Sequence, residues 1–238
     1  CDKPVADPGG GGINVSRAIK IMGGTSTAMV ALGGATGARI AGMLQADGLS
    51  VVRLTAPGET RQSLAVTDRR HGGQYRFVMP GPEWHMAQVA DMMSAIAEHA
   101  RGGGWVVVSG SNPPGVAPGF EQMLTVRLQD GRARLLVDTS GDALRALAGS
   151  SIPVDVLRMD SHEAEALAGR ALPLRADSAA FAAGRWGGHV VGVGGVAVAG
   201  DLAVNPRAAR LGVLEGLQHD DAGAFAHDEA VAVGVEWP

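Results

Sequence analysis

The chain has 238 residues, a formal net charge of −4 at pH 7, and hydrophobic side chains at 46% of its positions, which is enough to build the full core of one domain. It contains neither a long basic run nor an uninterrupted apolar run of ~18 residues, so we expect no nucleic-acid partner and no membrane span. Its single cysteine, Cys1, cannot form an internal disulfide, which favours a reducing compartment and hence the cytoplasm.

Four consecutive glycines near the start of the chain lead directly into an amphipathic segment. A glycine within regular structure costs roughly 0.5–1 kcal/mol relative to alanine, so the run needs a reason. Asn14 follows the glycines and suits a helix N-cap, and Gly23 with Gly24 suits a helix stop. A helix that begins here would present bare backbone N–H groups to a phosphate or a row of hydroxyls.

The glycine run has two other interpretations. The first is a tight turn between two elements, which binds nothing. The second is a dinucleotide site, which is disfavoured because no strand precedes the glycines and the GxGxxG spacing with a downstream acid is missing.

Farther along the chain, apolar strands alternate with helical segments. Strands are predicted at 25–34, 49–54, 105–110 and 133–138, and helices at 36–48, 86–100 and 120–130. Short, solidly apolar strands belong in a parallel sheet that is covered on both faces. The order predicts a layered α/β fold with right-handed crossovers, whose site lies at the carboxyl ends of the strands.

One region interrupts this alternation. Thr60–Asp68 and Gly73–Pro82 read as antiparallel strands, joined by the polar residues RRHGG. Tyr75, Phe77 and Met79 alternate onto one face of the second strand, and an isolated hairpin is marginally stable in water. We therefore expect this hairpin to form a lid or an interface.

Six motifs stand in the order found in one family. They are DPGGGGINVSRAIKIMGG (7–24), GGATG (33–37), TRQSL (60–64), QYRFVMPGP (74–82), VVVSGSNPPGV (106–116) and LLVDTSGDAL (135–144). Over about residues 1–186 the chain resembles the ribokinase-like (PfkB) carbohydrate kinases, in the branch of phosphofructokinases, 1-phosphofructokinases and tagatose-6-phosphate kinases.

This resemblance implies one ribokinase-like α/β domain over 1–238, with a mostly parallel central sheet and a small hairpin lid near 60–82. It also implies a glycolytic kinase that uses ATP and Mg²⁺ to phosphorylate a phosphorylated ketohexose, with fructose 6-phosphate first among the acceptors. Lids of the related kinases pair across a dimer, so a homodimer through the lid is expected.

The resemblance assigns roles to residues at the N-terminal half of the site. Gly10 and Gly11 would form the backbone floor under the sugar, and Asn14 would hydrogen-bond the sugar hydroxyls while also capping its helix. Arg76 would clamp the existing phosphate of the substrate through its bidentate donors, and the alternative is an exposed strand charge.

Further roles fall on the loops that follow two buried strands. Ser111 would contact the substrate, although Asn112 stands beside it where the family usually has an apolar residue. Asp138 would order the substrate side of the site, or it would only cap the helix that starts near Gly141.

The segment Val156–Leu167 resembles the family's metal-site segment. The pair at the relevant positions is Asp160 and Glu163, and their spacing places both carboxylates on one helix face, where they could hold Mg²⁺. The same spacing also makes a capping box, and the two readings stay open.

Two family features are not recognisable. The GAGD-type motif, whose aspartate is the catalytic base, is not found, so no catalytic residue is assigned. In the atypical tail from about residue 187, Val190–Gly200 resembles the strand pair that precedes this motif, and the rest of the tail lacks strand–helix rhythm. The chain also starts after the family's first strand, so an edge of the sheet and of the site is expected to be missing. A frame change or truncation would explain the tail, and the alternative function is an impaired or inactive remnant that binds sugar phosphate or only dimerises.

Overall fold

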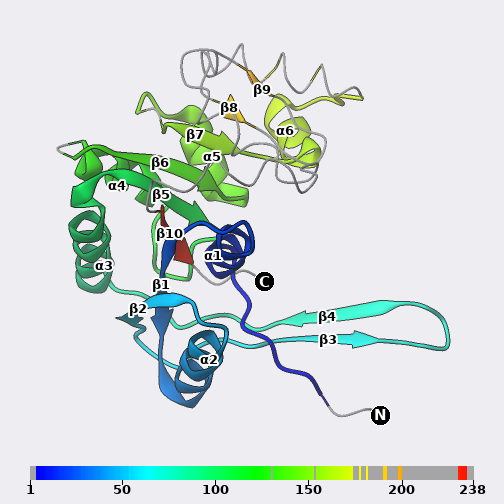
Figure 1. Cartoon of the computed structure of the whole chain (residues 1–238). Helices are drawn as coiled ribbons and strands as arrows, with labels where there is room; N and C mark the ends of the chain where they lie inside the picture. Colours follow the sequence, from blue (N-terminus) through cyan, green and yellow to red (C-terminus); the bar gives the residue numbers. More distant parts are fainter. Residues whose placement is uncertain are drawn as a thin grey trace.

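The computed structural model describes residues 4–129, 131–152 and 154–173, the single residues 177 and 181, and the backbone of 190–191, 198–199 and 230–234. Seventeen elements are defined in these parts of the chain (Figure 1). They are α1 Gly11–Ile21, β1 Ser26–Leu32, α2 Gly34–Ala46, β2 Ser50–Thr55, β3 Ser63–Thr67, β4 Gln74–Val78, α3 Met86–His99, the 3₁₀ helix η1 Ala100–Gly102, β5 Gly104–Ser109, α4 Phe120–Leu128, β6 Ala133–Asp138, α5 Gly141–Gly149, β7 Val156–Arg158, α6 Ser161–Ala168, β8 Val190–Val191, β9 Val198–Ala199 and β10 Ala230–Gly234.

The central sheet has the strand order β2-β1-β10-β5-β6-β7-β8-β9. Every neighbouring pair is parallel except β8 and β9, which are antiparallel. Helices α2, α4 and α5 each connect two strands that lie side by side in parallel, as expected of βαβ units. The predicted α/β fold with a mostly parallel sheet is therefore confirmed.

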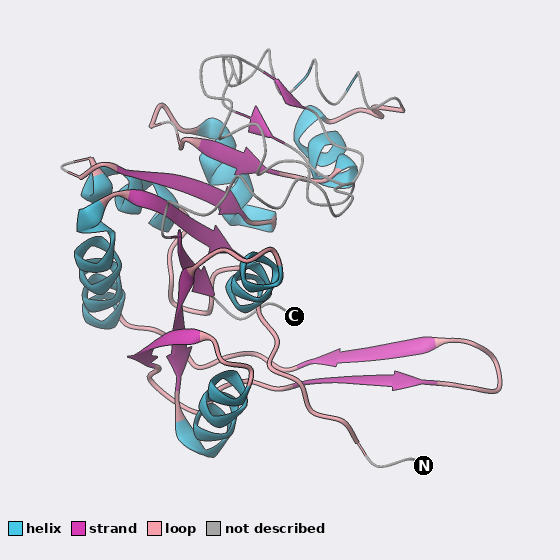
Figure 2. Cartoon of the chain, in the orientation of Figure 1, coloured by secondary structure: helices cyan, strands magenta, loops and turns pink. Residues whose placement is uncertain are grey.

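Helices cover both faces of the sheet, so the fold has three layers. Figure 2 shows α1 and α2 on one side of the sheet and α3 on the other. Strand β1 supplies both faces, because successive side chains of a strand point to opposite sides. Val30 packs in a cluster with Ile13 of α1 and Leu44 of α2, whereas Met29 belongs to the larger cluster that contains Ile96 of α3.

Helix α1 begins earlier than the sequence predicts. Its N-cap is Gly10 and its first residue is Gly11, so Asn14 lies in the first turn and its N–H donates to the carbonyl of Gly10 at 3.0 Å. The prediction of Asn14 as the N-cap is wrong, because the glycines themselves make the turn into the helix. The predicted stop is confirmed: Gly23 has a φ of 80°, and the N–H of Gly24 donates to the carbonyl of Ile19 at 2.9 Å.

The tail contributes to the centre of the sheet, which corrects the expectation that it lacks regular structure. Strand β10, with the sequence AVAVG, lies between β1 and β5 and is parallel to both. Small apolar residues suit a strand covered on both faces. The two short strands β8 and β9 lie within the segment 190–200, and Cys1 and residues 201–229 lie outside the described residues.

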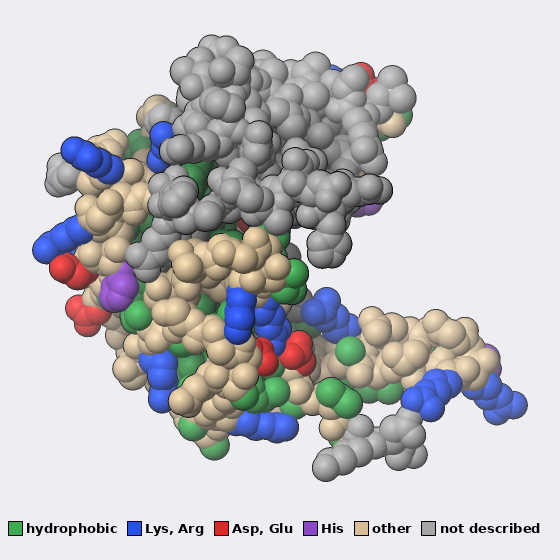
Figure 3. Space-filling view, in the orientation of Figure 1, with side chains coloured by type: hydrophobic (Ala, Val, Ile, Leu, Met, Phe, Trp, Pro, Cys, Tyr) green, Lys and Arg blue, Asp and Glu red, His purple; other side chains and the backbone are tan. Residues whose placement is uncertain are grey.

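The hairpin of β3 and β4 stands apart from the central sheet. It forms a two-stranded antiparallel sheet of its own, as predicted, and extends away from the rest of the molecule (Figures 1 and 3). Its register pairs Leu64 with Phe77 and Val66 with Tyr75, and all four side chains are exposed. One face of the hairpin is thus apolar and open to a partner.

No helix among the described residues has both the length and the apolar character that a membrane span requires.

Candidate functional site

Three polar side chains meet where neighbouring strands of the sheet end. Ser109 closes β5, Asp138 closes β6 and Arg158 closes β7, and the sheet register places them side by side. The hydroxyl of Ser109 donates to Asp138 Oδ2 at 3.2 Å, and Arg158 Nη1 donates to Asp138 Oδ1 at 3.1 Å. The carboxyl edge of the sheet therefore carries a connected polar chain, at the place where α/β folds bind ligands.

The start of α1 lies directly against this edge. A Cβ atom on Gly11 would overlap the hydroxyl oxygen of Ser109 and would lie 2.8 Å from the carbonyl oxygen of the same residue. Gly10 has a φ of 128°, which side chains rarely tolerate, and it is buried. Glycine is required at position 11 because the start of α1 lies against Ser109, and at position 10 because of the positive φ. The glycine run thus lets helix α1 begin at the end of β5.

The first turns of α1 and α2 differ in what they bind. In α2, the carboxylate of Glu59 accepts the N–H groups of Ala35 at 3.2 Å and Thr36 at 2.6 Å, and the hydrogen bond from the backbone of Thr36 lowers the pKa of Glu59. In α1, no side chain among the described residues caps the helix. Among the described residues, the first backbone N–H groups of α1 therefore have no side-chain acceptor, whereas those of α2 have Glu59.

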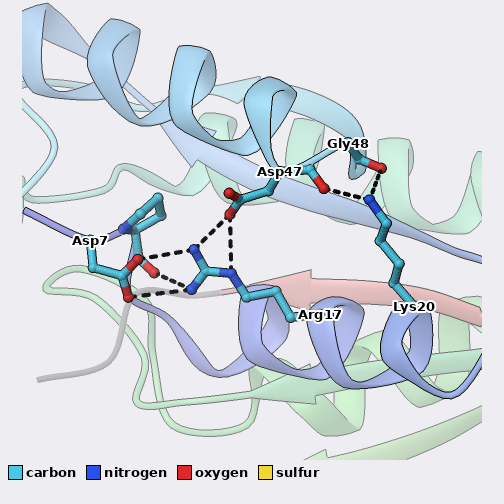
Figure 4. Close-up of polar contacts among 6 residues, drawn as sticks. Asp7, Arg17, Lys20, Asp47 and Gly48 are labelled. Carbon is cyan, nitrogen blue, oxygen red and sulfur yellow. Dashed lines mark hydrogen bonds and ion pairs between the residues drawn. The ribbon is translucent and has the colours of Figure 1, made fainter.

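A charged clamp fixes the segment that leads into the glycine turn. Arg17 of α1 contacts Asp7 at 3.2 Å, the carbonyl of Pro8 at 2.9 Å and Asp47, at the end of α2, at 2.8 Å (Figure 4). The hydrogen bond to Asp47 raises the pKa of Arg17. Lys20 adds a bond to the carbonyl of Gly48 at 3.0 Å. The glycine turn is thus held between α1 and α2.

Not all of the predicted substrate residues are brought together. Ser111 follows Ser109 by two residues and is half-buried at the same edge as Asp138. Asn14 lies in the first turn of α1, and its side chain is exposed. Arg76 lies on β4 of the hairpin, paired with Ala65 on the face opposite the apolar one, and no described residue forms an ion pair with it.

Asp138 does not cap α5, so that alternative is wrong. The N-cap of α5 is Ser140, and the carboxylate of Asp138 is occupied by Ser109 and Arg158. Sequence reasoning missed Ser109 and Arg158. Each is the last residue of its strand, as Asp138 is, so comparing the final residues of the buried runs could have found both.

Asp160 and Glu163 form a capping box, which is one of the two roles that the sequence allows for this pair. The backbone N–H of Glu163 donates to Asp160 Oδ1 at 2.8 Å, and the N–H of Asp160 donates to Glu163 Oε2 at 2.7 Å. Burial raises the pKa of Glu163. One oxygen of each carboxylate remains outside these bonds, so the capping box leaves the metal prediction open.

The loop between β5 and α4 covers a buried acid. Glu121, the second residue of α4, is fully buried, and its Oε1 accepts from the side-chain amide of Asn112 at 3.0 Å. Its other oxygen has no partner among the described residues. Burial raises the pKa of Glu121, and the hydrogen bond from Asn112 offsets this only in part.

The raised pKa of Glu121 predicts a pH dependence of stability. Between the ordinary glutamate pKa and the raised one, the folded state binds more protons than the unfolded state, so the free energy of unfolding falls as pH rises through that window. Glu121→Gln removes the titration. Its stability relative to the parent should increase as pH rises from about 4 toward neutrality, as measured by urea unfolding at several pH values. A difference that stays constant with pH would contradict the raised pKa.

Comparison with known proteins places the chain in a family. The sequence profile described as pfkB family carbohydrate kinase matches residues 1–191. The chain is 38% identical over 172 residues to ATP-dependent 6-phosphofructokinase isozyme 2 of Escherichia coli, covering 72% of this chain and 55% of that protein. It is 37% identical over 148 residues to the isozyme 2 of Mycobacterium tuberculosis, covering 62% of this chain and 44% of that protein.

Solved structures agree with this placement. The structure is similar to phosphofructokinase-2 from Escherichia coli in complex with fructose-6-phosphate, with a TM-score of 0.72 and 35% identity, covering 81% of this chain and 64% of that one. It is also similar to the tetrameric inhibited form of the same enzyme, with a TM-score of 0.69 and 37% identity, covering 76% and 59% of the two chains. The predicted ribokinase-like fold is therefore confirmed. The chain spans about half the length of the curated relatives named above.

Proposed function

The chain belongs to the pfkB family of carbohydrate kinases, and we propose that it transfers the γ-phosphoryl group of ATP to a phosphorylated ketohexose, with fructose 6-phosphate as the preferred acceptor. The observation that carries the proposal is the contact between the glycine turn and the polar chain at the carboxyl edge. There the backbone of Gly11 meets Ser109, and Ser109 is bonded to Asp138.

This arrangement suits a polyhydroxylated substrate. The uncapped first turn of α1 offers backbone donors and Asp138 offers carboxylate acceptors. Ser111 lies at the same edge of the sheet, in the loop that follows β5. Sugar hydroxyls are both donors and acceptors, so they can satisfy such a mixed set. Gly11 lets the start of α1 lie directly against Ser109, and in this proposal the backbone of Gly10 and Gly11 forms the floor under the sugar.

Arg76 supplies the charge for the substrate's own phosphate in this proposal. Its guanidinium lies on the face of the hairpin that does not carry Leu64, Tyr75 and Phe77. An arginine with no acidic partner among the described residues is available for an anion, and its fork of donors matches phosphate oxygens. Closure of the hairpin would bring it to the site.

The carboxylates of Asp160 and Glu163 fit Mg²⁺ bound together with a nucleotide. Each keeps one hard oxygen outside the capping box, and the described residues contain no third acid, histidine or cysteine grouped with them. Two protein oxygens are sufficient, because Mg²⁺ in such sites keeps waters and phosphate oxygens as its other ligands. The ion would neutralise charge on the transferring phosphate.

The direct test is turnover of ATP by the purified chain with fructose 6-phosphate, fructose 1-phosphate and tagatose 6-phosphate in parallel. We expect ADP to form fastest with fructose 6-phosphate. Asp138→Ala, purified from the same host, controls for contaminating kinases and should lose the turnover. Sugar-phosphate binding without turnover would favour a binding protein of this family. If the chain showed no binding and no turnover, the proposal would be refuted.

The single cysteine supports a cytoplasmic setting for the proposed kinase.

The apolar face of the hairpin predicts a homodimer. Leu64, Val66, Tyr75 and Phe77 lie together and exposed on it, and pairing two such faces would remove them from water. We expect a dimer by sedimentation velocity at micromolar concentration. Phe77→Lys should give a monomer, whereas Gln74→Lys, on the opposite face of the same strand, should leave the dimer intact. A monomeric parent, or equal effects of the two lysines, would count against this interface.

A further inference from the structure

The loop between β5 and α4 holds Ser111 between two anchored neighbours. On one side, the N–H of Gly110 donates to the carbonyl of Asp138 at 2.8 Å. On the other side, the side-chain amide of Asn112 donates to Glu121 at 3.0 Å. The position of Ser111 is therefore set by one backbone bond and one side-chain bond.

The far half of the same loop is fastened separately. The N–H of Trp84 donates to the carbonyl of Pro114 at 2.8 Å, and Gly115 has a φ of 85° where a Cβ would overlap the carbonyl oxygen of Trp84. Pro113 and Pro114 stiffen the chain between the two fastenings. The bond from Asn112 to Glu121 thus acts on the near half of the loop, which carries Ser111.

Burying the carboxyl group of Glu121 at this position costs free energy of folding. It is fully buried, its single side-chain partner is Asn112, and its second oxygen is unpaired among the described residues. An apolar residue in its place would avoid the desolvation of a carboxyl group. A buried polar pair of this kind fixes a geometry more narrowly than apolar contacts do, because a hydrogen bond is directional.

From this geometry we infer that Glu121 is a positioning residue: it holds Asn112, and through Asn112 it fixes Ser111 at the carboxyl edge of the sheet, where the substrate is bound. The inference rests on the proposed function for the role of Ser111 as a substrate contact. The placement of the loop by Glu121 stands without it.

Four variants and one control variant separate positioning from stability. Glu121→Gln keeps an acceptor for Asn112, whereas Glu121→Leu and Asn112→Leu each break the pair and leave one polar group buried alone. The double variant Asn112→Leu/Glu121→Leu removes both groups, so it should regain the stability that either single variant loses. Gln122→Leu is the matched control, since Gln122 is the next buried residue on α4 and forms no hydrogen bond to the loop among the described residues.

Affinity for fructose 6-phosphate is measured by calorimetry, and stability by urea unfolding. We expect Kd to rise about tenfold in Glu121→Leu and in Asn112→Leu, which is the change expected from one lost hydrogen bond. The double variant should stay about tenfold weaker although its stability returns. Glu121→Gln and Gln122→Leu should bind as the parent does. Recovery of parental affinity by the double variant would overturn the inference, because affinity would then only follow stability.

Amide hydrogen exchange of the free protein tests the loop without any substrate. The amides of Gly110, Ser111 and residue 112 should exchange faster in Glu121→Leu, in Asn112→Leu and in the double variant. In Glu121→Gln and Gln122→Leu they should exchange at the parental rate. Unchanged exchange in the double variant would refute the positioning role. If the parent binds no sugar phosphate while these amides respond as expected, the proposed function fails and the placement of the loop by Glu121 stands.

Discussion

Gly11→Val should lower the free energy of unfolding by about 3 kcal/mol or more, the upper range for overpacking at a site that cannot relax. The added Cβ would overlap the hydroxyl of Ser109 and press on its carbonyl oxygen, so helix α1 would have to move away from the end of β5. Urea unfolding monitored by circular dichroism measures the loss. The variant should therefore lose the fold around the site, and not only the binding of sugar.

Gly9→Ala is the matched control for this prediction. It adds a Cβ in the same glycine run, at an exposed position where nothing lies within 4 Å. Its stability should stay within about 0.5 kcal/mol of the parent. The double variant Gly11→Val/Ser109→Gly should recover only part of the loss, because the carbonyl of residue 109 stays in place. Parental stability of Gly11→Val would show that the helix does not lie against the strand.

Arg76→Ala should weaken the binding of fructose 6-phosphate by about 1.5–3 kcal/mol, which is the range for a hydrogen bond to a charged group. The physical reason is the loss of a bidentate cation from the proposed phosphate clamp, and titration calorimetry measures the effect. Because Arg76 is exposed and has no acidic partner among the described residues, stability should not change.

Arg70→Ala provides the control for charge alone. Arg70 lies in the turn of the same hairpin and is also exposed, so its removal changes the net charge equally. Its affinity for fructose 6-phosphate should match that of the parent. Equal weakening by the two variants would mean that the hairpin attracts the phosphate by its general charge, and unchanged binding in Arg76→Ala would remove Arg76 from the site.

The sequence predicts most of the fold because buried strands are nearly continuous apolar runs and the hairpin strands are set off by polar turn residues. β6 runs from Ala133 to Asp138, as predicted, and β3 and β4 lie inside their predicted ranges. The N-cap of α1 is Gly10, four residues before the predicted Asn14, because the positive φ of Gly10 makes the turn into the helix and asparagine's capping preference does not decide it. Strand β10 is not predicted, because short runs of alanine, valine and glycine also occur elsewhere in the tail.

The site was only partly accessible to sequence reasoning. Asp138 stands in a recognisable motif, but the bonds that Ser109 and Arg158 make to it depend on strand register, which one sequence does not give. Asp160 and Glu163 show a different limit. A spacing of three residues serves a capping box and a shared metal equally, and only coordinates show that the first is formed.

The separate hairpin has a consequence for how the protein responds to dilution. A two-stranded unit is marginally ordered by itself in water, so Arg76 is held no more firmly than the hairpin that carries it. If a second chain covers Phe77 and its apolar neighbours, dimerisation and occupancy of the proposed phosphate clamp become linked equilibria, and each favours the other by mass action. Diluting the protein below its dimer dissociation constant would then lower its apparent affinity for sugar phosphate, so the abundance of the chain would itself act as a regulator of binding.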